Sequence, residues 1–70
     1  MAEGISIQVN GQAQQTKPGA TVLVLLEQLG LNAGRVAIEY NLQILPKVKW
    51  SETKVAAGDR IEIVQFVGGG

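Results

Sequence analysis

The stretch GDRIEIVQFVGGG, Gly58 to Gly70, joins a turn, a strongly apolar segment and three glycines. Side chains alternate between the two faces of a strand, so Ile61 and Ile63 share one face and Val64 and Phe66 share the other. Strands of near-continuous apolar character are typical of central positions in a sheet. The stretch therefore predicts a central strand, and if Ile61 and Ile63 face the core, nothing in the sequence remains to cover Val64 and Phe66.

A hairpin is predicted at the start of the chain. ISIQV, Ile5 to Val9, alternates apolar and polar residues and reaches Asn10-Gly11, the pair that best tolerates the positive φ angles of a two-residue turn. The second arm, Gln12 to Thr16, is polar and is expected to be half exposed. We expect the final strand to run parallel to the first.

One helix is predicted between this hairpin and the next strand, from Thr21 or Val22 to about Leu29. Its apolar side chains recur at i, i+3, i+4 and i+7, namely at Val22, Leu25, Leu26 and Leu29. Thr21 can cap the first turn, and Gly30 with Leu31 fits a left-handed stop.

The middle of the chain predicts two further strands and a loop. RVAIEY, Arg35 to Tyr40, alternates again, and a short strand at Ile44-Leu45 would end at Pro46, which cannot donate a ladder hydrogen bond. The segment 47–57 is interpreted as irregular structure around Trp50, a partly buried lid on the core.

These elements predict an α+β fold, a mixed four- to five-stranded sheet packed on one helix. Residues 1–67 form the domain and residues 68–70 a flexible glycine tail, because glycines cannot pack and lose much backbone freedom on ordering. The expected core consists of Ile5, Ile7, Leu26, Ile38, Ile61 and Ile63.

Composition excludes several classes of function. The 70 residues contain no Cys and no His, which removes thiolate chemistry, the usual general base and the commonest metal ligand. Six basic residues balance six acidic ones without a run of either sign, so neither a nucleic acid nor a membrane is an expected partner. Lys47, Lys49 and Trp50 are interpreted as a solvated loop. Without a secretion signal in MAEG, we expect a cytoplasmic protein.

Side-chain catalysis is not expected. No two carboxylates form a recognisable acid and base pair, and the hydroxyl residues lack a His or Cys partner, so no catalytic or metal-binding residue is predicted. The glycine run is no phosphate loop, since such loops lead into a helix. The glycine run carries an ionised terminal carboxylate of pKa about 3.5. Because glycines have no side chains, they can thread into a narrow active site. A frayed terminus is the alternative.

On these residues the chain resembles the ubiquitin-like β-grasp sulfur carriers, most closely their thiamin branch. The resemblance rests on IQVNG, LLEQLGL, VAIEYN with ILP, and GDRIEIVQFVGGG, which together span nearly the whole chain. The molybdopterin branch is similar, but its tail usually carries prolines before an Ala-Gly-Gly ending. Two departures lie in turns: Leu42 where the family often has Gly, and Ala56-Ala57 where a polar residue is common.

The resemblance implies a co-substrate and not an enzyme. An E1-like adenylating enzyme would activate the Gly70 carboxylate with ATP and magnesium, and a cysteine-derived persulfide would convert it to a thiocarboxylate for thiazole synthase. Gly68 and Gly69 would thread into the partner's active site, and this chain would bind no cofactor itself. A ubiquitin-like protein modifier and a structural subunit with an inert tail stay open as alternatives.

We further expect Val64 and Phe66 to form a partner-binding surface, because exposed apolar patches usually mark contacts. The alternative is that a strand edge or Trp50 covers them.

Overall fold

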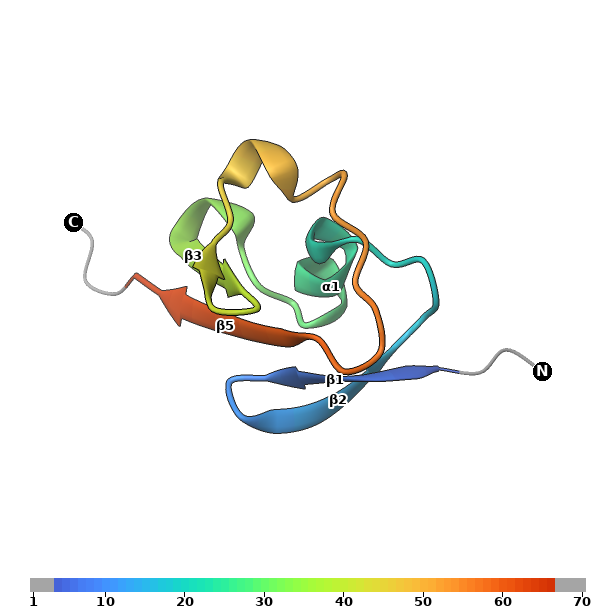
Figure 1. Cartoon of the computed structure of the whole chain (residues 1–70). Coiled ribbons are helices and arrows are strands. Elements are labelled where there is room, and N and C mark those ends of the chain that lie inside the picture. The colour runs from blue at the N-terminus through green and yellow to red at the C-terminus, as the bar shows by residue number, and fades with distance from the viewer. Residues whose placement is uncertain (1–3, 67–70) are drawn as a thin grey trace.

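The computed structural model describes residues 4–66, which form a five-stranded mixed sheet with one α-helix on one face (Figure 1). The strands are β1 (Ile5–Val9), β2 (Gln12–Thr16), β3 (Val36–Tyr40), β4 (Gln43–Ile44) and β5 (Arg60–Gln65), and the helices are α1 (Val22–Gln28) and two short 3₁₀ turns, η1 (Ala33–Arg35) and η2 (Lys47–Lys49). The order in the sheet is β2-β1-β5-β3-β4, so β5 is central. It runs parallel to β1 and antiparallel to β3, and the predicted α+β fold is confirmed.

The turn between β1 and β2 also pairs with β5. Asn10 and Gly11 adopt φ angles of 51° and 82°, as the two-residue turn requires. The Asn10 side chain then imitates a peptide group: its Oδ1 accepts a 2.7 Å hydrogen bond from the Ile63 N–H and its Nδ2 donates one of 3.2 Å to the Ile63 carbonyl. The ladder between β1 and β5 is thereby extended by one side chain.

Helix α1 begins at Val22 as predicted and ends at Gln28, with Leu29 as its C-cap. The Thr21 hydroxyl accepts a 3.2 Å hydrogen bond from the Val24 N–H, and Gly30 closes the last turn at φ 73°. The Gly30 N–H donates to the Glu27 carbonyl and the Leu31 N–H to the Leu26 carbonyl, which satisfies two carbonyl groups of the last turn. These caps stabilise a helix of only seven residues, too short to persist alone.

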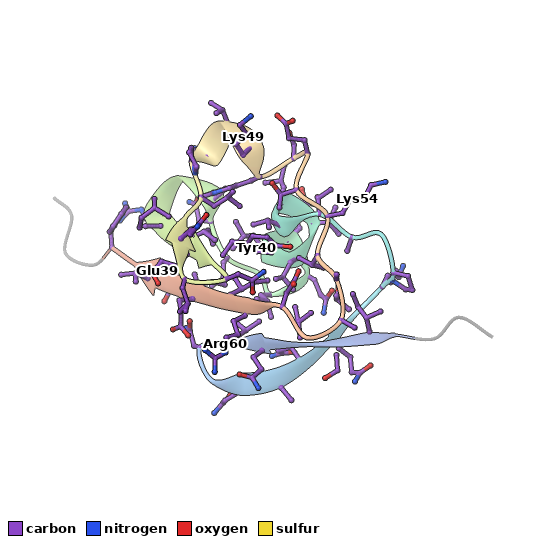
Figure 2. All side chains as sticks on the ribbon, viewed as in Figure 1. Glu39, Tyr40, Lys49, Lys54 and Arg60 are labelled. Atoms are coloured by element: carbon purple, nitrogen blue, oxygen red, sulfur yellow. The ribbon has the colours of Figure 1, made fainter. Side chains whose placement is uncertain are left out.

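Asp59 fixes the turn that leads into β5. Its carboxylate accepts hydrogen bonds from the Tyr40 hydroxyl, the Ala56 N–H and the Asn41 side-chain amide, and Tyr40 points from β3 toward this segment (Figure 2). Burial raises the pKa of Tyr40 to about 12, and the hydrogen bond and charge of Asp59 act in the same direction. Burial alone would raise the pKa of Asp59, but the hydrogen bonds from Tyr40, Ala56 and Asn41 outweigh it and lower that pKa below 3.8.

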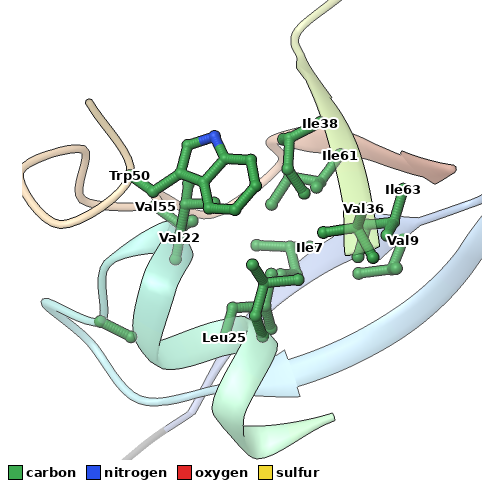
Figure 3. Close-up of a cluster of buried hydrophobic side chains, with 12 residues drawn as sticks. Ile7, Val9, Val22, Leu25, Val36, Ile38, Trp50, Val55, Ile61 and Ile63 are labelled. Carbon is green, nitrogen blue, oxygen red and sulfur yellow. The ribbon is translucent and has the colours of Figure 1, made fainter. Parts of the chain in front are cut away.

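The core lies between α1 and the helix-facing side of the sheet (Figure 3). Five of the six expected core residues are buried: Ile7, Leu26, Ile38, Ile61 and Ile63. Ile5 is only partly buried, because it occupies the first position of β1 at the margin of the cluster. Trp50 is buried more deeply than expected, at 3% exposure, with its Nε1 donating to the Leu45 carbonyl at 2.9 Å. It is a core residue and not a partial lid.

Two boundaries differ from the sequence prediction. Strand β4 is Gln43–Ile44 and not Ile44-Leu45, because Tyr40 pairs with Gln43 directly across the turn and Leu45 then bends toward the core. Segment 47–57 is less irregular than expected, since it contains η2 and a bridge between Lys54 and Thr21. Strand β2 is largely exposed as predicted, except for Thr16, which is buried and donates to Gln28 Oε1. The proposed boundary between a domain at 1–67 and a flexible tail at 68–70 lies outside the described residues.

Replacing Leu26 or Ile63 with Ala is expected to lower the free energy of unfolding by roughly 2 to 5 kcal/mol, because each truncation removes buried methyl groups and leaves a cavity. Urea denaturation followed by Trp50 fluorescence measures the change. Val48→Ala is the matched control, since Val48 is 78% exposed, and it should shift the free energy by less than about 0.5 kcal/mol. A core variant as stable as the parent would contradict this packing.

Acid is expected to weaken the fold through Asp59. Because the folded pKa of this group lies below the ordinary 3.8, its stabilising contribution is complete above pH 3.8 and is lost as the pH falls through the lowered folded pKa. Urea midpoints measured between neutral pH and pH 2 should therefore drop less steeply for Asp59→Asn than for the parent. Glu52→Gln, outside this hydrogen-bond cluster, should keep the parental slope; equal slopes for all three proteins would refute the assignment.

Candidate functional site

The candidate site is the face of the sheet that α1 does not cover. Strand alternation places Glu62 and Val64 of β5 and Ala37 and Glu39 of β3 on this face, and Phe66 follows in the same alternation. Val64 and Phe66 are 58% and 56% exposed. The prediction that these two side chains lie away from the helix is confirmed, and neither Trp50 nor a strand edge covers them; their role in partner binding stays a prediction.

Apolar exposure extends across the sheet to β4. Val64 lies opposite Ala37, and on the next strand Ile44 lies opposite Glu39. Ile44 is 72% exposed, as is Leu42 in the turn between β3 and β4. We call Leu42, Ile44, Val64 and Phe66 the outer apolar set. Sequence reasoning found only Val64 and Phe66 of these, because the register between β3 and β4 was needed to place Ile44 and to leave Leu42 in the turn.

Two carboxylates lie among these apolar groups. Glu39 of β3 is directly opposite Glu62 of β5, and like charges at opposed positions destabilise a sheet. Arg60 precedes Glu62 by two residues on the same strand face. The alternation of each strand is enough to place its glutamate on the face away from the helix, but the opposition of the two follows only from the register.

Strand β5 leads from this face toward the glycine tail. The Phe66 N–H donates a 2.8 Å hydrogen bond to the Arg35 carbonyl, so the chain is held beside β3 up to this residue. The predicted site residues Gly68, Gly69 and Gly70 lie outside the described residues. Their roles in threading and in carrying sulfur therefore stay predictions.

Elsewhere the described residues offer little reactive chemistry. An open groove of about 330 Å³ beside α1 is lined by Thr16, Lys17, Val24, Glu27 and Gln28. The Gln28 amide is already engaged, since its Oε1 accepts from the Thr16 hydroxyl and its Nε2 donates to the Gln15 carbonyl, both at 2.8 Å. Between residues 4 and 66 there is no group of three potential metal ligands, and no helix there has the length and apolar character to span a membrane.

Comparison with known proteins agrees with this geometry. The model of the ThiS family matches residues 7–70. The sulfur carrier protein ThiS of Escherichia coli is 39% identical over 66 residues, which cover 94% of this chain and 100% of that protein. A crystal structure of the thiamine biosynthesis protein ThiS from Geobacter metallireducens superposes with a TM-score of 0.81 at 30% identity and covers 94% of this chain and 100% of its own.

A longer relative contains a segment similar to this chain. The thiazole synthase of Paramagnetospirillum magneticum is 42% identical over 62 residues, which are 89% of this chain but only 19% of that protein. The family match, the full-length relatives and the shared ubiquitin-like β-grasp structure agree with one another. This chain belongs to the ThiS family.

Proposed function

We propose that this chain carries sulfur for thiamin biosynthesis as a thiocarboxylate on Gly70. The observation that carries the proposal is membership of the ThiS family over residues 7–70, together with full-length similarity to a sulfur carrier protein. The protein is a co-substrate and supplies no catalytic side chain. Its folded body presents the carboxylate, and partner enzymes perform the reactions.

Activation is required because a carboxylate oxygen is a poor leaving group. In the proposed first step the Gly70 carboxylate attacks the α-phosphate of ATP on a partner adenylating enzyme that also uses magnesium, which gives an acyl adenylate and pyrophosphate. The terminal sulfur of a cysteine-derived persulfide then displaces AMP. Cleavage of the sulfur–sulfur bond by a thiol leaves the thiocarboxylate on Gly70.

Thiazole synthase is the proposed acceptor of the sulfur. Proteins of that name from Paramagnetospirillum magneticum and Magnetococcus marinus each contain a segment similar to this chain, which occupies 19% and 20% of their length. A carrier-like segment and a thiazole synthase thus share one polypeptide in those relatives, which supports a functional association. We place the reactions in the cytoplasm, where ATP is available.

The face of the sheet that α1 does not cover is a suitable docking surface for the adenylating enzyme. Glycine residues 68–70 have no side chains, so they give the enzyme nothing by which to distinguish this carrier from another protein with the same tail. Exposed apolar groups on a rigid strand can supply that contact. We therefore propose that Val64 and Phe66 bind the adenylating enzyme while the tail enters its active site.

Incubation with a cognate adenylating enzyme, ATP, magnesium and a persulfide source is expected to add the mass difference of one sulfur replacing one oxygen. Fragmentation by mass spectrometry should locate it on Gly70. A variant that lacks Gly70, or one extended by a Trp after it, should gain no sulfur. In the first the tail is too short for its carboxylate to reach the active site, and in the second the Trp side chain blocks entry.

The controls separate this function from its alternatives. Thiolation of the shortened or extended chain at the parental rate, or sulfur on any other residue, would contradict the proposed carrier mechanism. Attachment of Gly70 to lysine side chains of other proteins would indicate a ubiquitin-like modifier, and sulfur transfer to a molybdopterin precursor instead of a thiazole precursor would indicate the molybdopterin branch.

Replacing Phe66 with Ser is expected to raise the KM of the adenylating enzyme for this carrier by about tenfold, as loss of an aromatic contact usually does. The urea midpoint should be unchanged, because Phe66 is 56% exposed and outside the core. Val48→Ser is the control, since η2 lies on the same side of the sheet as α1 (Figure 1). Unchanged kinetics for Phe66→Ser would remove Phe66 from the docking surface.

A further inference from the structure

Leu42 adopts a backbone conformation that its side chain disfavours. Strands β3 and β4 are joined by the two residues Asn41 and Leu42, with Tyr40 paired to Gln43 on either side. Both turn residues have positive φ angles, 52° for Asn41 and 72° for Leu42. Asparagine tolerates this left-handed region, but leucine is strained there and glycine is not.

The fold holds the turn in this conformation from the Asn41 side. The Asn41 N–H donates a hydrogen bond of 2.7 Å to the Arg60 carbonyl, and the Asn41 Oδ1 accepts one of 2.8 Å from the Arg60 N–H. The Asn41 amide also donates to Asp59. Leu42 is therefore kept at positive φ by contacts that do not involve its own side chain.

Packing does not explain a leucine at this position. The side chain is 72% exposed and belongs neither to the buried core nor to the partly buried residues around it. Its neighbour on β4, Ile44, is equally exposed. A strained residue whose side chain contributes nothing to folding points to a role outside the isolated protein.

The charges beside this turn indicate what kind of surface Leu42 meets. Glu39 and Glu62 lie opposite one another next to Ile44 and Val64, with Arg60 as the basic residue on the same strand face. Lys49 and Lys54 lie near η2 and α1, away from Glu39 and Arg60 (Figure 2). A cation between the two carboxylates would relieve their mutual repulsion, so the complementary surface is apolar and carries a basic side chain.

We propose that Leu42 is a specificity-determining anchor for the adenylating enzyme, which receives it in an apolar pocket beside a basic residue that contacts Glu39 and Glu62. The inference rests on the proposed function and names the determinant that the side-chain-free tail cannot provide. It extends the docking surface from Val64 and Phe66 to the β3–β4 turn. A second copy of this chain is a poorer occupant, because it would bring two further carboxylates and only one further basic residue, Arg60, so two faces of net negative charge would meet.

The test is the rate of pyrophosphate release by the adenylating enzyme as a function of carrier concentration. Leu42→Gly should raise KM about tenfold with kcat unchanged, as expected when one large apolar contact is lost from an interface. The same variant should have a higher urea midpoint than the parent, because the strain at φ 72° is relieved. Leu42→Met keeps an apolar side chain and should retain the parental KM, whereas Val48→Ala, on the far side of the sheet, should change neither quantity.

The charge component has a separate readout. The double variant Glu39→Gln/Glu62→Gln should raise KM at low salt and approach the parent at high salt, where screening removes the attraction. Glu27→Gln on α1 is the control and should match the parent at both salt concentrations.

Each remaining outcome contradicts the inference. If the parent is adenylated and Leu42→Gly has the parental KM, Leu42 is not an anchor, although the proposed function stands. If Leu42→Gly impairs only sulfur transfer to thiazole synthase, or if sedimentation shows a dimer of the parent that Leu42→Gly dissociates, the assigned occupant is wrong. A parent that is never adenylated overturns the proposed function and this inference together.

Discussion

Hydrogen bonds from two asparagine side chains to the backbone around β5 hold the centre of the sheet. Strand β1 pairs with β5 directly at only two positions, and Asn10 adds a third by bonding both backbone groups of Ile63. On the other flank, directly after the end of β3, Asn41 bonds both the carbonyl and the N–H of Arg60. Both asparagines have positive φ, so each ends its strand and extends the ladder at once. The position of β5 in the sheet depends on these contacts.

Within residues 4–66, one helix covers one face of the sheet and leaves the other face uncovered. In larger α/β proteins a second layer of helices would bury Val64 and Phe66, whereas the described residues form a single α-helix, α1. Val64 on the uncovered face belongs to β5, the strand that precedes the glycines in the sequence. Under the proposed docking, the partner contacts Val64 and Phe66 just before the glycines in the sequence. In the proposed carrier role, the folded body therefore contributes by binding the partner and not by catalysis.

Local patterns predicted the elements well, and long-range contacts account for what they missed. Asn10-Gly11, the cap at Thr21 and the stop at Gly30 are local signals, and each was found in place. Alternation also placed Val64 and Phe66 on the outer face. The deep burial of Trp50 and the opposition of Glu39 and Glu62 depend on partners distant in sequence, so no local pattern contains them. The exposure of Ile44 depends on the register of the β3–β4 hairpin, which the sequence prediction did not fix. The roles of Gly68, Gly69 and Gly70 were inferred from resemblance and from the absence of side chains.

The double hydrogen bond of Asn10 also bears on chemical ageing. Asparagine followed by glycine is prone to deamidation, in which the backbone nitrogen of Gly11 attacks the side-chain carbonyl. In the folded protein Oδ1 and Nδ2 of Asn10 are both hydrogen-bonded to Ile63, which opposes the rotation that this attack requires. Deamidated chains would carry an oxygen in place of the donor nitrogen and would set it against the Ile63 carbonyl. The rate of deamidation at Asn10 is therefore coupled to the fraction of time that this hairpin spends detached from β5.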